Sequence, residues 1–108
     1  MTVSEMYTLL NSITEFKDKV AYRQFKEGSA PALPFICFYV DETDNFKADD
    51  QTYFKRTTFN IELMTAKKDP PTEEALETAL NNAGIPWDYS ESYIESESCY
   101  LITYEVEV

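Results

Sequence analysis

The sequence has no histidine, and its 108 residues include only two glycines and two cysteines. Without histidine it lacks the commonest general base and the commonest metal ligand of proteins. No apolar run approaches the roughly 20 residues that span a bilayer. No basic start leads into an apolar segment, so we expect no signal peptide. Cys37 and Cys99 lack CxxC spacing and are too few for a disulfide framework, so we expect buried free thiols.

Basic residues are scarce and unevenly distributed. Twenty acidic against nine basic residues give a formal net charge of −11. Residues 1–40 carry four of each sign, whereas residues 69–108 carry ten acids and no base. DNA and anionic membranes repel such a chain, so we expect it to bind neither directly. One interpretation is that the acidic surface serves only solubility. Alternatively, it suits a basic partner, or it lines a passage through which DNA must move without binding.

Apolar residues are plentiful, at 44% of the chain, with aromatic residues at 15%. Burial of this much apolar surface offsets the entropy of ordering, which excludes overall disorder. A chain of this length supports one hydrophobic core, and no repeat, low-complexity segment or flexible linker divides it. We therefore predict a single domain over residues 1–108.

Capping and spacing predict the first elements. Thr2 and Glu5 have the spacing of a capping box, and apolar residues then recur at helical intervals at Val3, Met6, Tyr7, Leu10 and Ile13. Residues 14–19 are interpreted as a polar connection and residues 20–25 as a strand. Residues 28–34 form a turn region, and the next strand must begin after Pro34 because proline cannot donate to a ladder.

Residues 35–40 are apolar on both faces, which is typical of a central strand covered on both sides. Either a partner subunit covers one of these faces, or the loops of the domain itself shield it. Residues 41–52 are acidic and polar and are predicted to form a projecting hairpin loop. Residues 53–64 are predicted to form a long strand with Phe59, Ile61 and Leu63 facing inward.

The last part of the chain reads as a helix followed by two strands. Thr72 is predicted to cap the helix, and Gly84 and Pro86 to end it. Its apolar stripe consists of Ala75, Leu76, Ala79, Leu80 and Ala83. The strands are residues 89–95 and 99–108, joined by residues 96–98. The order of elements predicts an α+β fold, with a mainly antiparallel sheet of about five strands and two helices packed on one face.

No motif in the chain carries recognisable chemistry. The acidic loop of Asp41, Glu42, Asp44, Asp49 and Asp50 lacks the glycine and terminal glutamate of a calcium loop, so no metal site is predicted. Glu91 and Glu95 would lie about 13 Å apart on one strand face, too far for a glycosidase pair, and a solvated face is favoured. No nucleophile has a base beside it, and no glycine-rich phosphate loop exists. We predict no enzyme activity and no cofactor.

Several stretches, taken in order, resemble tail-region proteins of tailed phages and prophages, and in particular the tail terminator or tail-completion family of long-tailed phages. These stretches are Ala21-Tyr22-x-x-Phe25, Pro34-Phe35-Ile36-Cys37, Asp44-Asn45-Phe46-x-Ala48-Asp49, Tyr53, Ile61-Glu62-Leu63 with Thr65, Lys68-Asp69, and Tyr93-Ile94-Glu95-Ser96-Glu97. The resemblance covers residues 22–105, and its motifs are structural rather than catalytic.

The resemblance implies a structural virion protein in the tail or neck, assembled in the host cytoplasm. Copies would form a ring, commonly of six subunits, at the head-proximal end of the tail tube. The ring would stop tube polymerisation and join the head, so its partners would be the major tail protein and the head connector. The predicted interface residues are Asp44, Asn45, Phe46, Tyr53, Phe38, Lys67 and Lys68.

Two of these interface predictions have alternatives. Phe46 is either the anchor of the projecting loop on a neighbour or a ring that folds back onto its own domain. Lys67 and Lys68 either meet a neighbour's acids or lie in a merely exposed turn. An alternative function for the whole chain is an acidic inhibitor or DNA mimic that binds a basic host protein. The base-free stretch of residues 69–108 supports that alternative.

Overall fold

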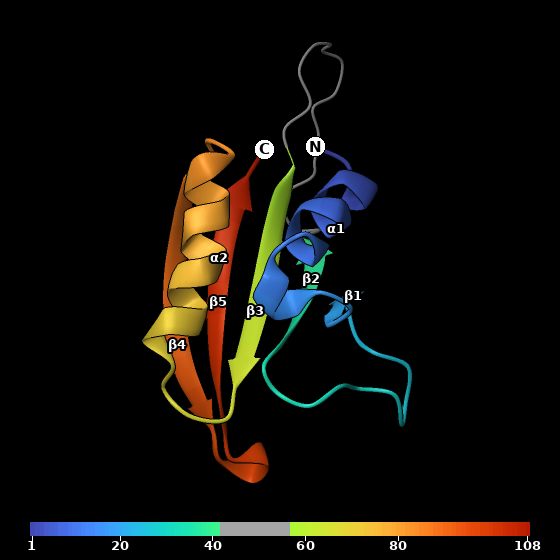
Figure 1. Ribbon diagram of the computed structural model, residues 1–108, viewed down its shortest axis with the longest axis vertical. Helices are drawn as coiled ribbons and strands as arrows, with labels where there is room; N and C mark the ends of the chain where they lie inside the picture. Colours follow the sequence, from blue (N-terminus) through green and yellow to red (C-terminus); the bar gives the residue numbers. More distant parts are fainter. Residues whose placement is uncertain (42–56) are drawn as a thin grey trace.

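One face of a five-stranded sheet carries both α-helices of the part of the chain that the computed structural model describes, residues 1–41 and 57–108 (Figure 1). The elements in chain order are α1 (Val3–Asn11), the 3-10 helix η1 (Thr14–Phe16), β1 (Val20–Tyr22), β2 (Phe35–Val40), β3 (Thr58–Thr65), α2 (Pro70–Asn82), β4 (Trp87–Ile94), the 3-10 helix η3 (Glu95–Glu97) and β5 (Cys99–Glu107). The predicted α+β class and order of elements are confirmed.

The strands lie in the order β1-β2-β3-β5-β4. The pairings β2–β3, β3–β5 and β5–β4 are antiparallel, and β1 pairs with β2 in parallel. β5 therefore lies between β3 and β4, although it is the last strand in the sequence. β1 and β4 form the two edges of the sheet, at opposite sides of the molecule.

Helix α1 begins with the predicted capping box. The Glu5 amide donates to Thr2 Oγ1 at 3.1 Å, and the Thr2 amide donates to Glu5 Oε1 at 2.8 Å. Met6 and Leu10 are fully buried, but Tyr7 of the same predicted stripe is 39% exposed. The core of this chain therefore covers only part of the apolar face of α1.

Helix α2 begins earlier than predicted. Asp69, not Thr72, is the N-cap, and Thr72 Oγ1 donates to Asp69 Oδ2 at 2.8 Å. The two prolines that follow Asp69 occupy the first helical positions, where their missing amides cost no hydrogen bond. The predicted end is confirmed: Gly84 has φ +73°, and the Ile85 amide donates to the Leu80 carbonyl at 2.9 Å, as in a Schellman motif.

Two predicted boundaries in the N-terminal part are also corrected. The strand predicted over residues 20–25 ends at Tyr22, because Arg23 adopts φ +70° and the Gln24 amide donates back to the Tyr22 carbonyl at 2.8 Å. The predicted polar connection over residues 14–19 contains η1, and its Phe16 is fully buried. The connection is therefore a part of the core.

The core lies between the helices and the sheet. The predicted inward residues of β3 are fully buried, and β2, β5 and α2 meet them with apolar side chains. The fully buried members are Met6, Leu10, Phe16, Ile36, Phe38, Phe59, Ile61, Leu63, Leu76, Leu80, Ile102 and Tyr104. In β5 the alternate residues Ile102, Tyr104 and Val106 also belong to this core.

Candidate functional site

The residues predicted to form a subunit interface have different positions in the structure. Asp44, Asn45, Phe46 and Tyr53 lie outside the described residues. Phe38 is fully buried, and its ring packs edge-on against that of Tyr22, with centroids 5.2 Å apart. The helix-facing side of β2 is therefore covered by this chain itself, and Phe38 offers no surface to a partner.

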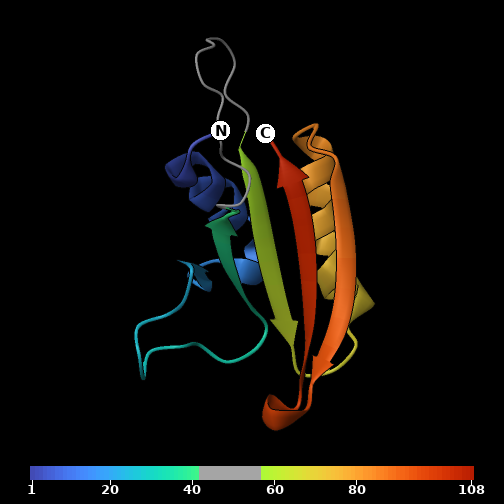
Figure 2. The ribbon, with the colours of Figure 1, turned by 180° about the vertical axis from the view of Figure 1, so that it is seen from behind.

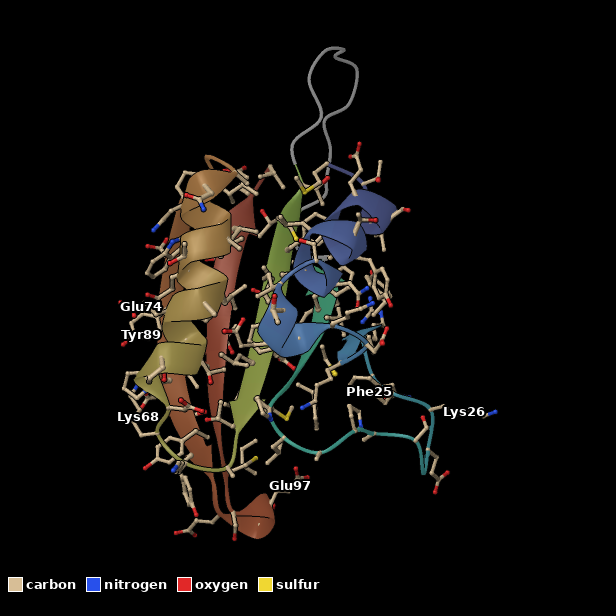
Figure 3. All side chains as sticks on the ribbon, viewed as in Figure 1. Phe25, Lys26, Lys68, Glu74, Tyr89 and Glu97 are labelled. Atoms are coloured by element: carbon tan, nitrogen blue, oxygen red, sulfur yellow. The ribbon has the colours of Figure 1, made fainter. Side chains whose placement is uncertain are left out.

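Lys68 lies in the segment between β3 and α2 (Figure 3). Its ammonium group binds two carboxylates of the same chain. Its Nζ donates to Glu73 Oε2 at 2.8 Å and also to Glu91 Oε1. These hydrogen bonds, first to Glu73 and then to Glu91, raise the pKa of Lys68. Glu73 is only 6% exposed, so Lys68 provides the opposite charge beside a buried side chain. Lys67 beside it is exposed.

Glu91 and Glu95 are both exposed, as expected, but they do not lie on one strand face. Glu91 lies on β4 opposite Ile102 of the core, and its carboxylate binds Lys68. Glu95 belongs to η3, beyond the end of the strand. Glu91 thus connects the strand to the segment before α2, and the two carboxylates do not share one strand face.

The face of the sheet opposite the helices has no helix over it in the described part of the chain (Figure 2). Three cross-strand rows on β2, β3, β5 and β4 follow from the register: Phe35–Met64–Leu101–Ser92, Cys37–Glu62–Thr103–Ser90, and Tyr39–Asn60–Glu105–Asp88. We call this surface the open face, although the Phe25 ring packs on Phe35 with centroids 5.1 Å apart and Cys37 is only 5% exposed. Its first row is apolar over three strands, and its last row carries two carboxylates, so polarity changes along the strands.

The open face also bears a hollow of about 440 Å³ near the start of β4. Its lining is Thr58, Pro86, Trp87, Asp88, Glu105, Val106 and Glu107. The lining holds three carboxylates and the hydroxyl of Thr58, and it contains no basic residue. Nothing in its lining assigns it a ligand.

A buried polar contact joins α2 to β5. The Tyr104 hydroxyl donates to Glu77 Oε2 at 2.7 Å, and the Tyr104 ring is fully buried. Trp87 packs beside this ring, with centroids 5.4 Å apart, and its Nε1–H donates to Asn81 Oδ1 at 3.0 Å. Burial and the Glu77 carboxylate hold the pKa of Tyr104 well above its usual value. This phenol therefore stays protonated and serves as a structural hydrogen-bond donor.

The cysteines are free and buried, as predicted. Burial raises the pKa of both thiols, and Glu62 adds to this effect at Cys37 as Glu97 does at Cys99. A raised pKa lowers the fraction of reactive thiolate. Over residues 1–41 and 57–108, no group of three or more cysteine or acidic side chains is arranged to hold a metal ion. No helix in the same ranges is long and apolar enough to cross a membrane.

Sequence reasoning missed the exposed tyrosines of β4. Tyr89 and Tyr93 are each 50% exposed, although they lie on the helix-facing side opposite Tyr104 and Tyr100. The alternation of aromatic residues with serine along this strand was the available signal. This alternation is typical of a strand, but only the sheet order shows that the strand is an edge.

The chain matches no protein-family model, and neither a curated protein nor a solved structure shows significant similarity to it.

Proposed function

We propose that this protein is a structural virion subunit of a tailed phage or prophage, acting as a tail terminator or head–tail joining component. Copies would form a ring, commonly of six subunits, at the head-proximal end of the tail tube. The major tail protein would contact one side of the ring and the head connector the other. The sequence resemblance described above motivates this proposal, and the geometry of the sheet supports it.

The observation that carries the proposal is the apolar row of the open face. Phe35, Met64 and Leu101 lie side by side on three strands, opposite the face that the helices cover. Each is only half-buried. Antiparallel sheets commonly have a polar solvated face, whereas this row keeps three large apolar side chains there. A subunit that works by assembly needs such a surface, because apolar cores distinguish permanent interfaces.

The charge distribution is compatible with a ring through which DNA passes. Asp88, Glu105 and Glu107 are exposed at one end of the open face, and no basic residue lies on its three rows. Carboxylates that line a lumen would repel the phosphate backbone. The same end of the open face would then meet the passing DNA without binding it.

Virions made without this protein test the proposal. We expect electron microscopy to show overlong tails or tails without heads, because nothing would stop tube growth or join the head. A Leu101→Lys variant should reproduce the defect by placing a charge in the apolar row. A Ser92→Lys variant, at the polar end of the same row, is the matched control. Tails of normal length with heads attached, in the absence of the protein, would contradict the proposal.

The exposed carboxylates also favour a second candidate, an acidic inhibitor or DNA mimic that binds a basic host protein. That function needs carboxylates spaced like phosphates on a small, non-assembling molecule. Native mass spectrometry across protein concentration separates the two. A mimic stays small and binds a basic target tightly, whereas a ring subunit forms higher oligomers or binds the ends of tail tubes.

A further inference from the structure

We infer that copies of this chain contact one another head to tail, with the β4 side of one copy against the β1 side of the next. The inference rests on the proposed ring assembly and names its contact. The β4 side is defined by Glu74, Tyr89 and Tyr93, and the β1 side by Tyr7, Tyr22, Lys19 and Lys26. Because these surfaces flank opposite edges of the sheet, one copy can engage two neighbours at once.

The first argument is the position of the exposed tyrosines. Tyr89 and Tyr93 on β4 are 50% exposed, and Tyr7 on α1 and Tyr22 on β1 are 39% and 37% exposed. Tyr22 lies on the edge strand β1, and Tyr7 lies on α1, the helix that packs against β1. Single exposed aromatic residues are ordinary, but a pair on each of two opposite sides is what a heterologous contact needs. Tyrosine is enriched in interface cores and hot spots.

The second argument is the separation of charge. Residues 69–108, which form α2, β4 and β5, carry ten acids and no base. The segments on either side of β1 carry Lys17, Lys19 and Lys26 among Glu15, Asp18 and Glu27, so this part of the chain is close to neutral. The three lysines have no ion pair within residues 1–41 and 57–108. Figure 3 places Glu74 and Tyr89 on one side of the molecule and Lys26 on the other. The acidic β4 side of one copy can therefore contact cationic side chains on the β1 side of a second copy.

Charge also decides against a two-fold contact. Two β4 edges placed together would oppose acids with acids, and the β1 side offers a short strand whose Tyr22 carbonyl already accepts from Gln24. A charged edge strand resists pairing with another strand. The contact is therefore made by side chains across opposite sides, and repetition of such a contact closes a ring when the rotation permits.

The test uses two complementary double variants. Tyr93→Ala with Glu74→Lys disables the β4 side, and Tyr7→Ala with Lys26→Ala disables the β1 side without creating a new charge pair between the two altered sides. Each should weaken self-association at least tenfold, an effect typical of interface hot spots. Mixed in equal amounts, the two should form a heterodimer and nothing larger, because each retains one functional side. Native mass spectrometry and sedimentation measure the species.

The controls are Tyr93→Phe and Tyr7→Phe, which keep the rings and should keep wild-type assembly. Circular dichroism verifies that every variant is folded. Oligomers that persist unchanged in both double variants would overturn the head-to-tail contact and leave the ring proposal standing. Absence of the heterodimer would also overturn it. A wild-type chain that stays monomeric would overturn the inference too, and binding to tail-tube ends would then decide the proposed function separately.

Discussion

The hydroxyl of Tyr104 binds a carboxylate 27 positions away in the chain, and the ammonium of Lys68 binds one carboxylate five positions away and another 23 positions away. Tyr104 reaches Glu77 across the boundary between β5 and α2, and Lys68 joins Glu73 to Glu91. Both contacts attach α2 to the outer half of the sheet. At the residue scale, the position of α2 therefore depends on polar contacts in addition to its apolar stripe.

Replacing Tyr104 with phenylalanine removes the buried hydroxyl without creating a large cavity. The free energy of unfolding should fall by about 1–2 kcal/mol, because the hydrogen bond to the Glu77 carboxylate is lost. Urea unfolding at pH 7 measures the change. The Tyr89→Phe variant, which changes a half-exposed phenol nearby, should differ from wild type by less than about 0.5 kcal/mol.

Tyr104 should also make the fold sensitive to alkaline pH. Burial first, and then the hydrogen bond to Glu77, raises its pKa above the ordinary value of 10.0. Above about pH 10 the unfolded chain releases this proton while the folded chain keeps it, so stability falls as pH rises. Ionisation of this residue lowers the free energy of unfolding by up to about 1.4 kcal/mol for each pH unit.

The contribution of Tyr104 is the difference between wild type and Tyr104→Phe in the slope of unfolding free energy against pH. Urea unfolding of both proteins between pH 8 and pH 11 should therefore show a steeper loss for wild type. Equal slopes in the two proteins would mean that Tyr104 ionises at its ordinary pKa in the folded state.

Lys68→Met should destabilise the protein by about 1–2 kcal/mol. The effect is smaller than the roughly 3–5 kcal/mol of a fully buried pair, because the Lys68 side chain is 42% exposed while that of Glu73 is 8% exposed. The neighbouring Lys67→Met is the matched control and should change stability by less than about 0.5 kcal/mol. Equal effects of the two variants in urea unfolding would refute a specific role for Lys68.

At the scale of elements, the N-terminus of α2 provides a test of the revised cap. Asp69→Ala should cost about 1 kcal/mol, because the Thr72 amide loses its side-chain acceptor. Asp69→Ser keeps an acceptor and should stay close to wild type. The midpoint temperatures of thermal unfolding of the two variants and of wild type measure these differences. A larger loss from Thr72→Ala than from Asp69→Ala would restore Thr72 as the cap that the spacing predicts.

The sequence predicted most element types, because periodicity and capping are local signals. The α2 cap was misplaced because Thr72 precedes acidic residues and resembles a cap, while Pro70 as first helical residue was the better signal. The early end of β1 follows from the positive φ of Arg23, which no local pattern reveals. The Lys68 contacts were also beyond prediction, because Glu91 is 23 positions away and only the fold brings it close.

At the scale of the whole molecule, net charge governs encounters with other polyanions. The formal charge of −11 predicts no measurable binding to duplex DNA at physiological salt. Fluorescence anisotropy with labelled DNA should show no change up to about 100 µM protein, at the weak end of the usual non-specific range. Binding that weakens with added salt would show a cationic surface and would argue against the lumen proposed for the ring.

The central position of β5 has a consequence for synthesis on the ribosome. β3 pairs on one side with β2 and on the other with β5, so its second neighbour is translated only after α2 and β4. Until then, Phe59, Ile61 and Leu63 lie beside an unpaired backbone edge, which is a template for aggregation. Nascent chains that stall before residue 99 should therefore depend on chaperones more than completed ones.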